Sequence, residues 1–149
     1  MGPGDVRPDH RPPGAKSFDF AINQVSISPP ERAENLDFSS SYYDTAQAVV
    51  TVEGSPVAGA SSLADLKDAK IGAMVGTTSL TVAQESIEPT TDVQVFNDND
   101  QVKQALQSGL VDAIVVDLPT ALYITAAELD GGVLVGQLPR GRRPGPVRP

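Results

Sequence analysis

The chain alternates between short runs of apolar residues and longer stretches in which apolar residues recur at helical spacing. The short runs are rich in Val, Ile and Ala and predict β-strands. The longer stretches predict amphipathic helices. Strands are predicted at residues 46–52, 70–75, 92–96, 112–116 and 133–135, and helices after Ser62, after the loop 76–79, after Asn97 or Asp98, and from Pro119. Because the two kinds of element alternate with short connections, we expect an α/β fold, a mostly parallel sheet flanked by helices on both faces.

A further segment precedes this alternating region. Residues 18–22 carry apolar side chains at every second position, which predicts a short strand with one buried face. The polar loop 23–28 follows, and then a single arginine, Arg32. An arginine near small hydroxyl and amide side chains, such as Ser26 and Gln24, can present planar N–H donors to a carboxylate. The alternative is an ordinary surface loop whose arginine pairs with a nearby acidic residue, and the composition of the segment alone favours it.

Two more polar loops follow predicted strands, where open α/β sheets bind their ligands. Thr77 and Thr78 precede a helix, whose first N–H groups could hold a carboxylate together with them. The alternative is that Thr78 or Ser79 only caps that helix. Asp117 directly follows an apolar strand and suits the ammonium group of an α-amino acid, but it could equally cap the helix from Pro119. The residues alone leave both choices open.

Composition and charge exclude several classes of function. The 149-residue chain has a formal net charge of −8, and its acidic residues dominate the central region. Nucleic-acid binding is therefore not expected, because it needs a basic surface. There is no cysteine, and the single His10 lies in a Pro-rich leader, so we expect no disulfide, no metal site and no cofactor.

The two ends differ from the rest of the chain. Residues 1–16 and 136–149 are rich in Pro, Gly and Arg and lack a periodic apolar pattern, so we expect a disordered leader and a disordered basic tail. The leader has no apolar core segment and is not predicted to be a signal peptide. No apolar run approaches the ~20 residues that a membrane-spanning helix needs.

Several segments resemble one known family. The order N-Q-V-S-I-S-P-P-E-R-A-E-N-L-D-F-S-S-S-Y-Y at residues 23–43 is similar to that of the polar amino-acid-binding proteins of ABC transporters, solute-binding protein family 3. The likeness continues through I-G-A-M-V-G-T-T-S at 71–79 and G-L-V-D-A-I-V-V-D at 109–117. Family members usually have one proline before the Glu-Arg pair, whereas this chain has Pro29 and Pro30.

The resemblance implies the type 2 periplasmic-binding-protein fold, which has two lobes. It predicts a remnant of the first lobe with the carboxylate motif at 17–47 and an α/β second lobe at 48–135, so that the chain is truncated at both ends. Half of a two-lobe clamp cannot close over a ligand and exclude water from its charges, so weak or undetectable binding is expected.

The resemblance also implies roles for single residues. The arginine matching Arg32 pairs with the α-carboxylate of the ligand. The residue matching Thr78, with the backbone around Thr77, completes that contact. The aspartate matching Asp117 takes the α-ammonium. Positions matching Gln24 and Ser26 contact the backbone of the ligand.

By the same resemblance, the chain is expected to be a non-enzymatic, monomeric binding component of an amino-acid importer. Its expected partners are the amino acid and the permease subunits. Family members work in the periplasm or anchored outside the membrane, although this sequence as given, without a signal peptide, would stay in the cytoplasm. Two alternatives remain: a dehydratase-like enzyme on the same fold, with Glu31 or Asp117 as general acid, and the ligand-sensing domain of a receptor.

Overall fold

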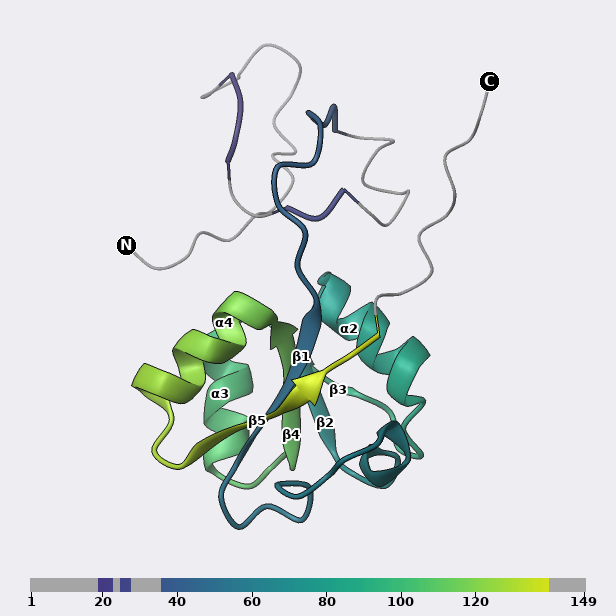
Figure 1. Ribbon diagram of the computed structural model, residues 1–149, viewed down its shortest axis with the longest axis vertical. Helices are drawn as coiled ribbons and strands as arrows, with labels where there is room; N and C mark the ends of the chain where they lie inside the picture. Colours follow the sequence, from purple (N-terminus) through teal and green to yellow (C-terminus); the bar gives the residue numbers. More distant parts are fainter. Residues whose placement is uncertain (1–18, 23–24, 28–35, 140–149) are drawn as a thin grey trace. The chain divides into compact units, whose positions relative to one another are not determined.

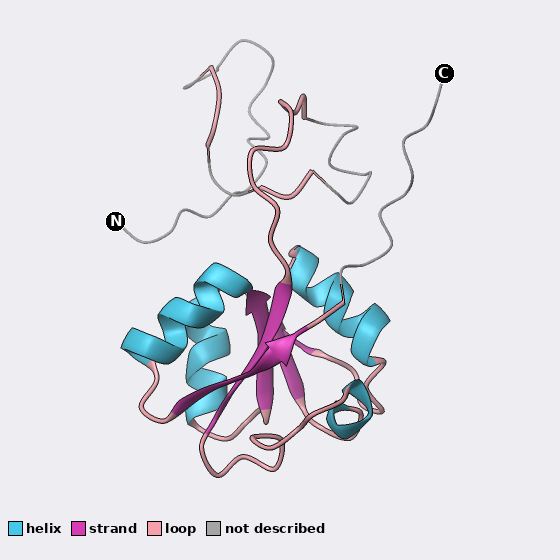
Figure 2. Ribbon diagram, viewed as in Figure 1, coloured by secondary structure: helices cyan, strands magenta, loops and turns pink. Residues whose placement is uncertain are grey.

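The computed structural model describes residues 19–22, 25–27 and 36–139. The chain divides into two compact units, Met1–Ser39 and Ser40–Pro149. Every helix and strand of the described residues lies in the second unit (Figures 1 and 2).

The second unit is built on a mixed five-stranded sheet with the strand order β3-β2-β4-β1-β5. Its strands are β1 (Gln47–Val52), β2 (Ile71–Met74), β3 (Gln94–Phe96), β4 (Ala113–Asp117) and β5 (Gly132–Gln137). β2 pairs in parallel with both β3 and β4, while β1 pairs antiparallel with β4 and with β5. Four strands therefore share one direction and β1 alone runs against them. The predicted α/β class with a mostly parallel, helix-flanked sheet is confirmed, and the reversed strand is an addition to it.

β1 and β2 are joined without a long crossover helix. The connection contains one helical element, η1 (Leu63–Leu66), a single turn of 3-10 helix about 8 Å long. β1 and β2 pair with opposite sides of β4 and run in opposite directions, so the chain reverses its direction between them.

Helices cover both faces of the sheet (Figure 1). On one face lie η1 and α2 (Thr78–Val82), which continues as a π-helical turn, η2 (Ala83–Ile87). On the other face lie α3 (Asn99–Gln107) and α4 (Leu118–Tyr123), which continues as the π-helical η3 (Ile124–Glu128). The central strands bury side chains on both faces: Val49 and Val115 pack with the first set of helices, Val50 and Ile114 with the second.

Two sequence predictions about the margins of the fold are wrong for the residues described. Residues 19–22 form no strand, and Phe20 and Ile22 are 77% and 76% exposed. Alternation predicts a strand only if a neighbouring strand supplies hydrogen bonds and an apolar surface, and neither is present for these residues in the described chain. At the other end, the expected disordered tail begins too early: β5 extends to Gln137, and Leu138 is buried with its N–H donating to Gln47 O (2.8 Å).

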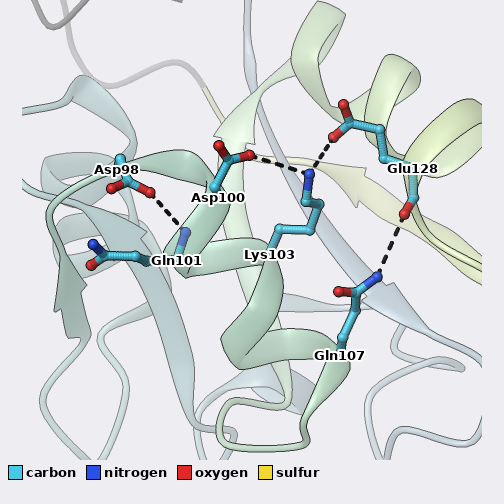
Figure 3. A network of polar contacts seen from close by, with 6 residues as sticks. All are labelled: Asp98, Asp100, Gln101, Lys103, Gln107 and Glu128. Atoms are coloured by element: carbon cyan, nitrogen blue, oxygen red, sulfur yellow. Dashed lines mark hydrogen bonds and ion pairs between the residues drawn. The ribbon is translucent and has the colours of Figure 1, made fainter. Parts of the chain in front are cut away.

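A polar network joins the two helices on one face (Figure 3). Lys103 Nζ, on α3, lies 2.8 Å from Glu128 Oε2 at the end of η3 and 3.3 Å from Asp100 Oδ1. Gln107 Nε2 donates to Glu128 O (3.5 Å) in the same region. The hydrogen bond to Glu128 raises the pKa of Lys103 above its ordinary value, because it favours the charged amine. The network ties α3 to η3.

The raised pKa of Lys103 gives a pH-dependent prediction. Its contribution to stability is fully present below the pKa of about 10.4 that lysine has in the unfolded chain, and is lost as pH rises through the higher folded value. We expect Lys103→Met to lower the free energy of unfolding by about 0.5–1 kcal/mol at pH 7. The difference from the unsubstituted chain should shrink above pH 10.4 in urea unfolding. Lys67→Met, at an exposed lysine, is the control, and an equal loss at both pH values would contradict the electrostatic explanation.

Candidate functional site

The loop after β2 positions two of the predicted site residues. Gly76 has a φ of +68°, a left-handed conformation that glycine adopts without steric cost. The turn at Gly76 brings Thr77 to the start of α2, where its Oγ1 accepts from Leu80 N (3.3 Å) and donates to Met74 O (2.7 Å). Thr77 is thus the capping residue, rather than Thr78 or Ser79. Thr78 is the first residue of the helix, and both threonines are half-buried.

Asp117 ends β4 and caps α4. Its Oδ1 accepts from Thr120 N (3.0 Å), and its Oδ2 accepts from Thr120 Oγ1 (2.7 Å). The capping role considered from the sequence is therefore present. It does not use up the carboxylate, because an ionised carboxylate has about four lone-pair directions and two are occupied by these bonds. The side chain is half-buried, so part of it is accessible to solvent or a ligand.

The structure brings Thr77, Thr78 and Asp117 to the same edge of the sheet. β2 and β4 are parallel neighbours, so their carboxyl ends lie side by side. In Figure 1, α2 and α4 both begin at this edge, on opposite faces of the sheet. The edge therefore places hydroxyl groups and the first turn of a helix beside a carboxylate. This arrangement complements a zwitterion, with donors for its negative end and an acceptor for its positive end.

The structure does not place the other three predicted site residues relative to this edge. Gln24 and Arg32 lie outside the described residues. Ser26 is described and half-buried, but it belongs to the first unit.

Two residues at this edge, Gln47 and Thr120, were missed by sequence reasoning. Gln47 opens β1 opposite Asp117, and its Oε1 accepts from Ser79 Oγ at 2.6 Å. Thr120 donates twice to Asp117. The spacing of Asp117 and Thr120, three residues apart at a helix start, is a recognisable capping signal. No comparable local signal marks Gln47, because its partners are distant in the sequence.

The described residues also contain a hollow, but no metal-binding cluster and no helix able to span a membrane. The hollow, of about 250 Å³, lies between β1, β5 and residues 60–63, and none of the three site residues lines it. Among the described residues, no group of three or more His, Cys, Asp or Glu side chains is placed to hold a metal ion. None of the helices described is both long and apolar enough to cross a membrane.

The comparison with protein families decides the assignment. Residues 12–117 match the model of the bacterial extracellular solute-binding proteins, family 3. This match takes in more than half of the chain and includes all six predicted site residues. The chain belongs to this family.

Individual relatives are similar over part of their length. The L-arginine-binding protein of Pseudomonas aeruginosa is 29% identical over 103 residues, which are 68% of this chain and 39% of that protein. An ancestral arginine-binding protein, solved with arginine bound, is 33% identical with a TM-score of 0.63 over 74% of this chain and 49% of its own. An ancestral amino-acid-binding protein described as a precursor of cyclohexadienyl dehydratase is 29% identical, with a TM-score of 0.58 over 76% and 52% of the two chains. The chain thus spans about half the length of these relatives, or less.

The capping role of Asp117 can be tested separately from any ligand. Asparagine is as good a capping residue as aspartate, so Asp117→Asn should leave the free energy of unfolding within about 0.5 kcal/mol of the original. Asp117→Ala removes the cap and should cost about 1 kcal/mol. Urea unfolding of both variants checks the pair. Equal losses would show that the negative charge of Asp117, not its cap, stabilises the fold.

Proposed function

We propose that this chain acts as the solute-binding component of an amino-acid ABC importer, outside the cytoplasmic membrane. Support comes from membership of family 3 and from the arginine-binding proteins among its relatives. In this proposal the chain recognises an amino acid and delivers it to permease subunits, and carries out no chemistry on it.

The edge formed by β2 and β4 is the observation that carries the proposal. The α-carboxylate of the ligand lies against Thr77, Thr78 and the first turn of α2, where main-chain N–H groups point toward the helix start. The α-ammonium contacts Asp117, at the end of the neighbouring strand. The family resemblance further implies that Arg32 pairs with the α-carboxylate and that Gln24 and Ser26 contact the backbone of the ligand.

Two observations favour an amino acid with a cationic side chain. The chain has a net charge of −8, whose long-range field attracts cations. The relatives include proteins described as binding arginine. L-arginine is therefore the ligand of choice for a first test.

The dehydratase alternative has one observation in its favour, the similarity to an ancestral protein described as a dehydratase precursor. That protein is itself described as an amino-acid-binding protein. Asp117 also has a role that needs no catalysis, because both of its oxygens accept from Thr120 at the start of α4.

A calorimetric titration of the full chain with L-arginine tests the proposal. Charges at an open edge are screened by water, so we expect a Kd of about 1 mM. Asp117→Asn should weaken binding by about tenfold or more, since it removes the charge from a charge-assisted hydrogen bond and keeps the cap.

The matched control is Asp130→Asn, which removes one negative charge at an exposed position in the turn before β5. It should change the Kd by less than about twofold, because an exposed charge far from the ligand is screened. No heat of binding in the unsubstituted chain, or the same loss in both variants, would contradict the proposed site.

A further inference from the structure

Gln47 connects the two halves of the proposed site. Its main chain is held on both sides, because it pairs with Asp117 of β4 and its carbonyl accepts from Leu138 N (2.8 Å). From this anchored position its side-chain Oε1 accepts from Ser79 Oγ at 2.6 Å. Ser79 lies in the first turn of α2 and is only 9% exposed. One side chain therefore links the strand end that carries Asp117 to the turn that carries Thr78.

We propose that Gln47 is a positioning residue that sets the distance between the carboxylate-binding and ammonium-binding halves of the site, and so selects α-amino acids. This inference rests on the function proposed above and adds a residue and a selection rule to it. Gln47 need not touch the ligand itself. It acts through Ser79.

The need for such a link follows from the way the two halves are held. Asp117 is fixed by the pairing of β4 with β1. Thr77 and Thr78 follow a turn through Gly76, beyond the last residue of β2, and the side chain of Thr77 bonds back to that strand at Met74 O (2.7 Å). The bond between Ser79 and Gln47 adds an attachment to a second strand, β1, directly beside Asp117. A hydrogen bond at a largely buried site is poorly replaced by water, so it restrains the turn strongly.

The link has a consequence that a purely stabilising contact lacks. In an α-amino acid one carbon separates the ammonium nitrogen from the carboxylate carbon, and in a β-amino acid two carbons do. When the turn that carries Thr78 is held at a fixed distance from Asp117, it accommodates the shorter spacing of an α-amino acid better than the longer spacing of a β-amino acid. When the bond between Ser79 and Gln47 is lost, the turn can adapt to both spacings. The ratio of the two affinities therefore reports the positioning role, whereas a general loss of stability weakens both ligands alike.

The test is an NMR titration of the full chain with L-arginine and with L-β-homoarginine, which has one extra methylene between the two groups. We expect L-arginine to bind more tightly to the unsubstituted chain. The readout is the Kd for L-β-homoarginine divided by the Kd for L-arginine. Gln47→Met keeps the length of the side chain and removes the acceptor, and it should lower this ratio by about 2- to 10-fold, the effect of one hydrogen bond. Ser79→Ala removes the donor of the same bond and should lower the ratio similarly.

Two further variants separate positioning from general effects. Gln47→Glu retains an acceptor for Ser79 and should keep the ratio, because its extra charge affects both ligands equally. Gln107→Met makes the same replacement at α3, where the amide donates to Glu128 O, and should also keep it. If Gln47→Met unfolds the chain, Ser79→Ala gives the same readout.

An unchanged ratio in Gln47→Met or in Ser79→Ala, with binding intact, would overturn this inference alone. Absence of ligand-dependent shifts in the unsubstituted chain would overturn the proposed function and this inference with it.

Discussion

The reversed strand β1 is the constraint on which the rest of the second unit depends. Its residues 48–51 are 0–1% exposed, and it pairs antiparallel with a strand on each side. Its far end is also fixed, since Thr51 Oγ1 and Ser55 Oγ both donate to Asp112 O, at 2.6 and 2.8 Å. Because β1 runs against its neighbours, its first residue lies among the carboxyl ends of the other strands. A parallel β1 would place Gln47 at the opposite edge, away from Asp117 and Ser79.

The proposed site uses groups that also stabilise the fold. Asp117 and Thr77 cap the two helices that start at this edge, and we propose that the same side chains contact the ligand. A helix cap satisfies only part of the hydrogen-bonding capacity of its side chain, so a capping residue can contact a ligand without giving up the cap. Asp117 can therefore be both a helix cap and a ligand contact.

The fold was largely predictable because its information is local. Apolar runs such as AIVV before Asp117 indicate buried strands, and the capping signal near Asp98 located the start of α3, where its carboxylate accepts from Gln101 N. The direction of β1 was not predictable from its own residues, since apolar periodicity does not distinguish a parallel from an antiparallel strand. The alternation of apolar residues at 18–22 wrongly predicted a strand, because periodicity does not show whether a partner strand exists. Gln47 escaped notice because its contacts, with Ser79 and Asp117, join residues far apart in the sequence.

We propose that the edge formed by β2 and β4 holds the two charged groups of an amino acid, and a crystal structure of the chain grown with L-arginine is the decisive test. We expect carboxylate oxygens within about 3.2 Å of Thr78 or its neighbouring main-chain N–H groups, and the α-ammonium at a similar distance from Asp117. Arginine bound elsewhere, for instance in the hollow between β1, β5 and residues 60–63, with Asp117 bonded only to Thr120, would contradict it.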